Sequence, residues 1–175
     1  MPSSIDIISF VSAGTDAVSA INAQLAAHSA GSGGTVVVTN PGTATLVGGN
    51  GDEQLIGGAG NNWIFGGLGA DTLTGGGVAN QFVYTAAAES LVVGGDVITN
   101  FNPLADQLIF QGLLHGTFAF LGVAGFTGSG NSQARFDDAT KLLSIDLDGN
   151  GAADMGITLA RVALANLGPS DFLWT

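Results

Sequence analysis

Large apolar side chains recur every nine residues in the middle of the chain. Residues 48–83 divide into four blocks, GGNGDEQLI, GGAGNNWIF, GGLGADTLT and GGGVANQFV. The eighth position of each block is apolar, and the same interval continues backwards, giving the series Val37, Leu46, Leu55, Ile64, Leu73 and Phe82. A side chain that points inward between two outward neighbours is typical of a strand. Each block is therefore predicted to hold one short strand.

A glycine pair opens every block and predicts a tight turn before each strand. Glycine adopts positive φ and allows close backbone approach at no steric cost. One block cannot bury its apolar side chain alone, so successive blocks must stack to form a core. The pattern predicts an all-β fold in which residues 46–83 form a parallel β-roll or β-helix.

The residues before the blocks are predicted to cap this coil as a strand, a helix and a strand over residues 1–45. Thr15 or Asp16 can begin a helix. Its apolar face would consist of Val18, Ile21, Leu25 and Ala26. The run TVVV that follows is predicted to be a strand. A helix laid over the open end of the coil would cover its unpaired edges, and packing against the side of the roll is the alternative.

The pattern changes after Val83, and residues 84–175 are predicted to form a mixed β domain that closes the far end of the coil. The segment 94–110 carries two strand-like runs. The segment 134–162 reads as strands joined by a tight turn at DGNG.

Charge narrows the choice of partners. The chain of 175 residues has 14 acidic and 3 basic residues, with a net charge of −11. Nucleic acids and anionic membranes need clustered Lys and Arg, so we expect neither as a partner, whereas cations suit this chain. There is no cysteine. No apolar run is long enough to cross a membrane, and we expect neither membrane insertion nor a Sec-type signal peptide.

The four blocks resemble the RTX nonapeptide G-G-x-G-x-D-x-U-x, and GGLGADTLT matches it at every defined position. The resemblance implies a β-roll that holds Ca²⁺ between turns of every second repeat. Its ligands would be backbone carbonyls and the sixth-position carboxylate. Calcium prefers six to eight oxygen ligands, which such turns supply.

The sixth positions of the blocks differ, and they predict two unlike edges. Alternate blocks share an edge, so we expect calcium on the edge whose residues are Gly49, Gly51, Glu53, Gly67, Gly69 and Asp71. The other edge would be weak or empty, because its side chains carry no charge; its residues are Gly58, Gly60, Asn62 and Asn80. The alternative is a set of glycine turns that bind no metal.

Further acids lie after the blocks. Asp96 and Asp106 are candidate ligands that could complete a site at the last coil. In DLDGNGAAD, the residues that fit an EF-hand-like loop are Asp146, Asp148, Asn150 and Asp154. The flanking runs LLSIDL and MGITLA look like strands, so we expect a β-hairpin, whose loop could still bind calcium.

The region after the blocks resembles the C-terminal domain that follows RTX repeats in serralysin-type secreted metalloproteases. The resemblance rests on GPSDFLWT at the terminus and on Asp96, Val97, Ile98, Phe101, Asp106, Leu108 and Ile109. It implies a secreted protein that the type I secretion machinery exports through an uncleaved C-terminal region. Such a chain would fold outside the cell, where calcium is plentiful.

We expect no enzyme, because His28 and His115 lie far apart and neither HExxH nor G-x-S-x-G occurs. The predicted function is a secreted calcium-binding module for folding and export. A surface or matrix protein that binds glycans is the alternative, and a small β-helix enzyme acting on polysaccharides is a further one. Trp63 could stack on a sugar, but we expect it to pack against the C-terminal domain.

Overall fold

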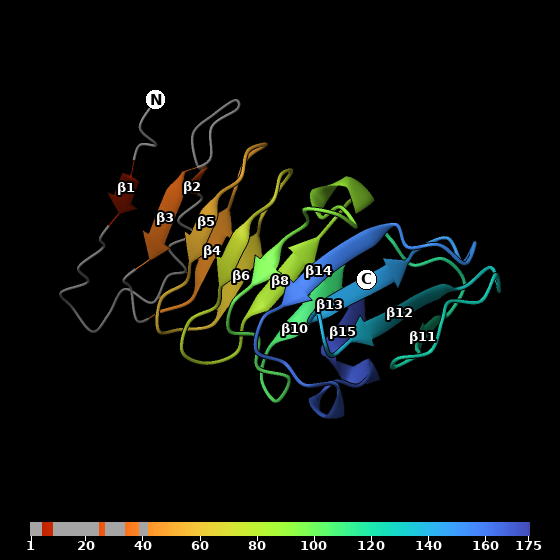
Figure 1. Cartoon of the computed structure of the whole chain (residues 1–175). Coiled ribbons are helices and arrows are strands. Elements are labelled where there is room, and N and C mark those ends of the chain that lie inside the picture. Colours follow the sequence, from red (N-terminus) through yellow and green to blue (C-terminus); the bar gives the residue numbers. More distant parts are fainter. Residues whose placement is uncertain (1–4, 9–24, 27–33, 39–41) are drawn as a thin grey trace.

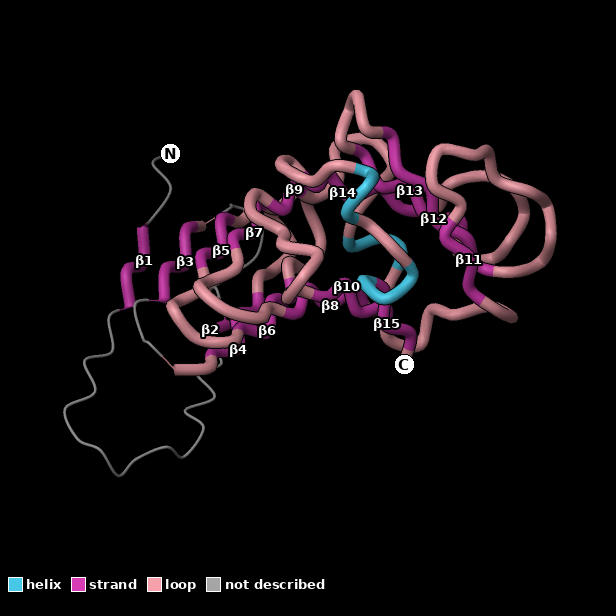
Figure 2. Tube along the Cα trace, turned by 90° about the horizontal axis from the view of Figure 1, so that it is seen from below, coloured by secondary structure: helices cyan, strands magenta, loops and turns pink. Residues whose placement is uncertain are grey.

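A computed structural model describes residues 5–8, 25–26, 34–38 and 42–175. This part of the chain is nearly all β, with two sheets that face each other (Figures 1 and 2). Three short 3₁₀ helices accompany the strands, η1 (Ala87–Glu89), η2 (Leu164–Asn166) and η3 (Pro169–Asp171). No helix in the described ranges is both long enough and apolar enough to span a membrane.

Within the described residues, one sheet has nine strands and the other has six. The order in the nine-stranded sheet is β1 (Ile5–Ile8), β3 (Thr35–Val38), β5 (Gln54–Ile56), β7 (Thr72–Thr74), β9 (Val97–Ile98), β14 (Met155–Leu159), β13 (Leu142–Asp146), β12 (Ser132–Asp137) and β11 (Phe118–Phe120). The order in the six-stranded sheet is β15 (Phe172–Trp174), β10 (Gln107–Phe110), β8 (Gln81–Tyr84), β6 (Asn62–Phe65), β4 (Ala44–Val47) and β2 (Leu25–Ala26).

The repeat blocks form a parallel β-roll, as predicted. Successive strands alternate between the two sheets, so each strand pairs with the strand two blocks away. Leu55 lies opposite Leu73, and Ile64 lies opposite Phe82. These side chains are fully buried, together with Leu46. The nine-residue interval therefore exists because every eighth-position side chain must reach the core between the sheets.

The series of inward residues breaks at its first member. Thr35 pairs with Gln54, so Val36 and not Val37 lies opposite Leu55. Val37 pairs with Ile56 and is only half-buried. The coil before the repeats is one residue longer than a repeat pair, and the prediction for Val37 is wrong by that one residue.

Two strands of the predicted cap lie within the described residues. β1 and β3 pair in parallel at the end of the nine-stranded sheet. A helix is wrong for Leu25 and Ala26, which form β2 and pair with Leu46 and Val47 of β4. Pairing lets β2 and the edge of β4 satisfy each other's backbone groups, whereas a helix would leave that sheet edge unpaired. The rest of the predicted helix lies outside the described residues.

The C-terminal residues extend both sheets of the roll. β9 pairs in parallel with β7, and β10 pairs in parallel with β8. β12, β13 and β14 then form antiparallel hairpins, and β15 adds to the edge of β10. One continuous hydrophobic cluster runs from Leu46 to Phe172. An aromatic stack of Tyr84, Phe110 and Trp174 carries this core into the last strand.

Trp63 does not pack as predicted. It lies on the outer face of β6, between Thr45 of β4 and Gln81 of β8 in the strand register. Its side chain is 40% exposed, whereas its neighbour Ile64 is fully buried. The prediction that the C-terminal strands cover it is wrong, because they extend the sheets lengthwise instead of folding over their outer faces (Figure 2).

Candidate metal centre

The sixth-position side chains form two rows along the roll, one on each edge. We call Glu53, Asp71 and Asp96 the acidic row. Asn62, Asn80 and Asp106 form the amide row. Every one of these side chains is buried, although all are polar or charged. The structure thus brings together the residues that the sequence assigned to each edge, and it adds one acid to the end of each row.

The same kind of hydrogen bond links the members of both rows. In each case a side-chain oxygen accepts the backbone N–H of the preceding member of the same row. The donor–acceptor distances are 2.7 Å from Glu53 N to Asp71 Oδ1, 3.0 Å from Asp71 N to Asp96 Oδ1, 3.2 Å from Asn62 N to Asn80 Oδ1, and 2.7 Å from Asn80 N to Asp106 Oδ1. The sixth position therefore requires an acceptor side chain, which Asp and Asn both supply.

Asp96 and Asp106 occupy row positions although they lie outside the nine-residue blocks. Each stands two residues before a fully buried apolar side chain, Ile98 in one case and Leu108 in the other. The same spacing separates Asp71 from Leu73. An aspartate two positions before a core residue therefore marks a row position even where the turn before it is longer than in the repeats.

The acidic row carries unbalanced negative charge. No Lys or Arg pairs with it in the described ranges, where the ion pair found joins Lys141 to Asp138. Asp71 Oδ2 is buried and has no hydrogen-bond partner. Burial raises the pKa of Asp71 to about 6, and the charges of Glu53 and Asp52 add to the effect. Burial of this kind disfavours the ionised form unless a cation compensates it.

Asp96, at the end of the row, is a second buried carboxylate whose ionised form is disfavoured. Burial and the neighbouring charge of Asp71 together raise the pKa of Asp96 to about 7. The Tyr84 hydroxyl donates to Asp96 Oδ2 at 3.0 Å, which partly stabilises the carboxylate. Burial in turn raises the pKa of Tyr84 well above its ordinary value.

The glycine turns beside the acidic row stack too closely for any other residue. Gly67 and Gly69 have φ of +96° and +124°. A Cβ on Gly67 would collide with the carbonyl oxygen of Gly49, and a Cβ on Gly69 would collide with that of Gly51. These backbone oxygens lie in the same stacked turns as the row carboxylates. An unpartnered buried carboxylate oxygen beside stacked carbonyls is a donor set that fits a hard cation such as calcium.

The amide row has a different chemistry. Its turns contain Gly58 and Gly60, whose carbonyl oxygens accept hydrogen bonds from Asn62 Nδ2 at 3.2 and 2.8 Å. Asn62 Nδ2 also lies 3.0 Å from Asn80 Oδ1. The one carboxylate of the row, Asp106, lies at its end and accepts from Asn80 Nδ2 at 3.0 Å.

A second acidic group lies in the loop between β13 and β14, which form the predicted hairpin. The potential ligand atoms of Asp146, Asp148 and Asp154 lie within 4.8 Å of one another. Asp146 Oδ1 accepts from Gly149 N and Asp154 Oδ2 accepts from Leu147 N, at 2.8 and 2.7 Å. The amide of Asn150, the fourth predicted ligand, donates to Asp148 Oδ2 at 3.0 Å. The carboxylates thus shape the loop as well as offering oxygens to a cation.

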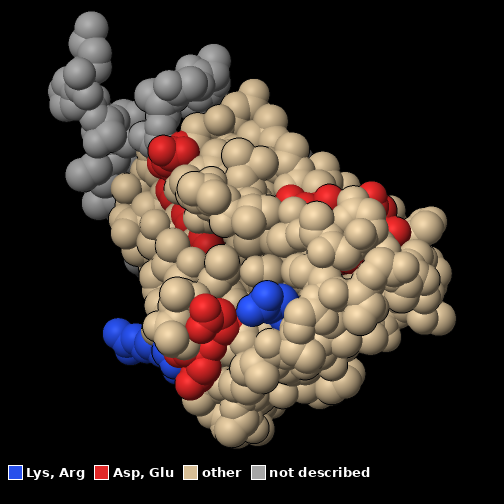
Figure 3. All heavy atoms as spheres, turned by 45° about the vertical axis from the view of Figure 1, so that its right-hand side comes forward, with Lys and Arg blue, Asp and Glu red and all other residues tan. Residues whose placement is uncertain are grey.

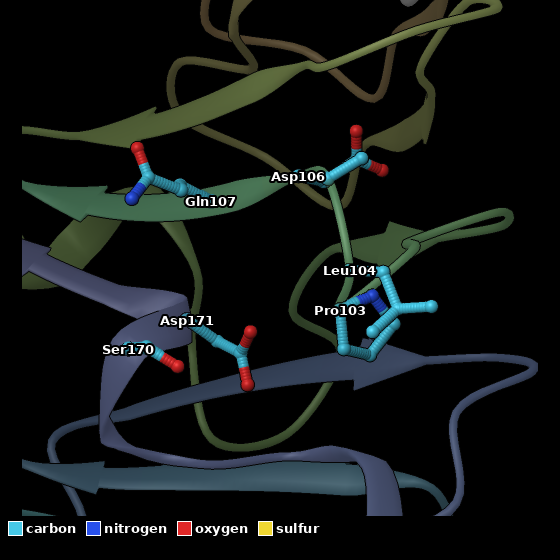
Figure 4. A pocket seen from close by; sticks show the side chains of 7 residues that line it. Pro103, Leu104, Asp106, Gln107, Ser170 and Asp171 are labelled. Atoms are coloured by element: carbon cyan, nitrogen blue, oxygen red, sulfur yellow. The ribbon is translucent and has the colours of Figure 1, made fainter.

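The end of the amide row opens into a pocket of about 250 Å³ (Figure 4). Asp106 lines it together with Asp171, a residue that the sequence did not single out as a ligand. Burial raises the pKa of Asp171, while the Gly168 N–H that donates to it at 2.7 Å acts in the opposite direction.

On the face shown in Figure 3, acidic side chains outnumber the basic ones. The overall electrostatic preference is for cations.

The comparisons with known proteins agree with this geometry. Residues 47–82 match the family model of the RTX calcium-binding nonapeptide repeat, in four copies. These blocks are RTX repeats. Calcium is the ion that RTX repeats bind, and the acidic loop of the β13–β14 hairpin is a further group that could hold it.

The fold has a counterpart among solved structures. The solution structure of the AlgE6R3 subunit from the Azotobacter vinelandii mannuronan C5-epimerase superposes with a TM-score of 0.53 at 22% sequence identity. The match covers 81% of this chain and 78% of that one. At this identity the match establishes a common fold, and the fold is the β-roll. No curated protein sequence shows a significant match.

Proposed function

We propose that this protein is an extracellular calcium-binding module whose acidic row holds the ion. The observation that supports this most directly is the buried, unpartnered Oδ2 of Asp71 among the carboxylates of Glu53 and Asp96. Leaving a buried charge uncompensated is costly, so a site with this composition gains stability from a divalent cation. Binding rather than catalysis is the role we propose.

Calcium bound at this row would couple to folding. The row members belong to different coils, and their side chains meet only when the coils stack. A ligand that binds the folded state alone stabilises it in proportion to the logarithm of its concentration. The protein would be less stable where calcium is scarce and more stable where it is plentiful.

This coupling supports a role in export. RTX proteins are typically extracellular, and a chain that folds fully only in calcium would stay competent for transport inside the cell. We propose that the C-terminal region, whose last strand is β15, is read by the type I secretion machinery. Fusing residues 84–175 to a reporter and measuring its release with and without that machinery tests the proposal; release independent of the machinery would overturn it.

Calcium binding is tested by calorimetry on the chelator-stripped chain. The wild type is compared with Asp71→Asn and with Asp137→Asn, which makes the same charge change at an exposed carboxylate outside the row. We expect Asp71→Asn to weaken binding at least about tenfold, because it removes a charged oxygen ligand, and Asp137→Asn to leave it unchanged. A folded wild type that binds no calcium would refute the function, and equal binding by Asp71→Asn would move the ion elsewhere.

A glycan-binding surface is the second candidate, and Trp63 is the observation that favours it. The exposed indole lies between Thr45 and Gln81 on an outer sheet face, and Gln107 follows Gln81 in the strand register. Aromatic rings with flanking polar groups suit sugar rings, which are apolar on one face and hydroxylated at their edges. A glycan array with wild type and Trp63→Ala decides this: loss of a signal in the variant supports it, and no signal for the wild type excludes it.

A further inference from the structure

The amide nitrogen of Asn62 lies among three oxygens at the turn where an RTX ion would be expected. The distances from Nδ2 are 3.2 Å to Gly58 O, 2.8 Å to Gly60 O and 3.0 Å to Asn80 Oδ1. Two of these oxygens belong to the turn of the same block, and the third comes from the next coil of the same edge. A positively polarised N–H group therefore occupies the point on which the oxygens converge.

The orientation of this amide follows from its surroundings. Asn62 Oδ1 is buried without a hydrogen-bond partner in the described part of the chain. Exchanging the two ends of the amide would place Oδ1 against the three oxygens, which only a cation could compensate. The structure leaves one acceptor without a partner and avoids the larger repulsion of four oxygens facing each other.

The acidic row has no comparable donor at the corresponding position. Glu53 Oε2 accepts from Gly49 N at 2.8 Å, and the carboxylates of Glu53 and Asp71 offer no N–H to the turn carbonyls. Both edges are built on the same kind of row hydrogen bond, but their turns are not identical, because Val78 of the amide edge stands where the acidic edge has Gly69. The difference that bears on a cation is whether the sixth-position side chain brings a donor or a negative charge to those turns.

The donors of the amide row continue along its length. Asn80 Oδ1 accepts from Gly76 N at 3.1 Å as well as from Asn62. Asn80 Nδ2 donates to Asp106 Oδ1 at 3.0 Å. Asp106 Oδ2 accepts from Asn102 N at 2.9 Å. The row therefore ends on a carboxylate whose two oxygens are both hydrogen-bonded.

We propose that the amides of Asn62 and Asn80 replace calcium on this edge, so that the roll has one edge that depends on calcium and one that does not. The inference rests on the proposed function, because it needs calcium on the acidic row for the contrast. Its consequence is that chelation loosens the acidic edge while the amide edge keeps its coils stacked. Asn62 is then the residue that determines which edge accepts an ion.

The wild-type protein provides the first test, by ¹⁵N nuclear magnetic resonance of the Asn62 side-chain amide. We expect its N–H signals to exchange slowly with water both in EDTA and at saturating calcium, with no calcium-dependent shift. A large shift with loss of protection at saturating calcium would mean that Oδ1 has turned to an ion, and the inference would be overturned.

A pair of variants provides the second test. Asn62→Asp places a carboxylate against the three oxygens, and we expect its melting temperature in EDTA to fall by roughly 2–8 °C. Calcium should restore it, with one more ion bound per chain in calorimetry. Asn61→Asp is the matched control, since Asn61 is exposed and its side chain accepts from Ala79 N. The control should change neither quantity.

The remaining outcomes also decide. If Asn62→Asp gains no ion while it folds, or if Asn62→Ala loses one, the amide edge does not work as proposed. If Asn62→Asp is unfolded in EDTA, its refolding on addition of calcium, followed by circular dichroism, counts as the gain. Absence of any calcium binding by the wild type would refute the proposed function, whereas the amide signals and the gain in Asn62→Asp would still test this inference separately.

Discussion

At the scale of single residues, Asp71 is a buried carboxylate whose charge no described residue compensates in the ion-free protein. Its side chain is 1% exposed, one carboxylate oxygen accepts the Glu53 N–H, and the other has no partner in the described chain. Asp96, the next member of the row, has both of its carboxylate oxygens hydrogen-bonded and is fully buried. These two residues determine how the protein responds to pH and to calcium.

The ion-free protein is expected to lose stability as pH rises from about 4 to about 7. The folded-state pKa values of Asp71 and Asp96 are raised from 3.8 to about 6 and about 7, so the folded state binds more protons than the unfolded chain in this range. A raised carboxyl pKa contributes stability that is complete below its ordinary value and is lost as pH rises through the folded-state value. Urea denaturation in EDTA across this range measures the effect.

Calcium should reverse this dependence. The ion binds the deprotonated carboxylates, so its affinity is expected to rise through the same pH window. Repeating the denaturation series at saturating calcium should give a stability that is flat or rising with pH. An ion-free stability that increases from about pH 4 to about pH 7 would show that other groups control the response.

Asp71→Asn is expected to have opposite effects with and without calcium. In EDTA near pH 8 it should raise the free energy of unfolding by about 1–3 kcal/mol, since it removes a buried charge and introduces a donor like that of Asn62. At saturating calcium it should be less stable than the wild type. Thermal melts in both buffers, with Asp137→Asn as the control, reveal the crossover; a variant that is destabilised equally in both would contradict it.

At the scale of elements, the stacked glycine turns fix the register of the coils. Gly67→Ala is expected to cost about 2–4 kcal/mol, because the residue has φ of +96° and its Cβ would meet Gly49 O. Gly125→Ala is the control, since a Cβ there meets nothing within 4 Å. Denaturant titration of both variants measures the difference, and a similar cost at the two positions would argue against close stacking of the turns.

The strands of the roll were predictable because each buried side chain follows a fixed interval along the chain. The same regularity misplaced Val37, since one added residue before the repeat puts Val36 opposite Leu55 in the strand register, and the composition does not reveal such an insertion. The apolar residues around Leu25 have the spacing of a helix, yet Leu25 and Ala26 pair as a strand with β4, and the spacing alone does not distinguish the two. A periodic pattern locates a core, but the length of an irregular turn decides which residue reaches it.

The two rows were predictable in part. Alternate blocks place Glu53 with Asp71 and Asn62 with Asn80, and this needs only the period of the repeat. The placement of Asp96 and Asp106 needed the path of longer turns, which sequence leaves open. Which end of the Asn62 amide faces the turn carbonyls depends on oxygens from two blocks at once, and no local pattern contains that information.

At the scale of the whole molecule, the core is continuous from the repeats to the last strand, so the protein should unfold as one unit. Calcium at about one hundred times its dissociation constant adds roughly 2.7 kcal/mol to the free energy of unfolding and should raise the melting temperature by roughly 5–10 °C. Calorimetry should show one transition that moves as a whole. Two transitions, of which only the first moves with calcium, would mean that the repeats and the C-terminal strands unfold separately.

The row hydrogen bonds, from a backbone N–H to a side-chain oxygen 18 residues later, also limit how such a chain can change in length. Inserting a single nine-residue block within the roll would move every later block to the opposite sheet. Asp71 would then continue the row of amides, and Asn80 would continue the row of acids. Inserting two blocks together keeps each row on its own edge and leaves Asp96 and Asp106 at the correct ends. Duplication during evolution, and any lengthening by design, is therefore expected to proceed in pairs of repeats.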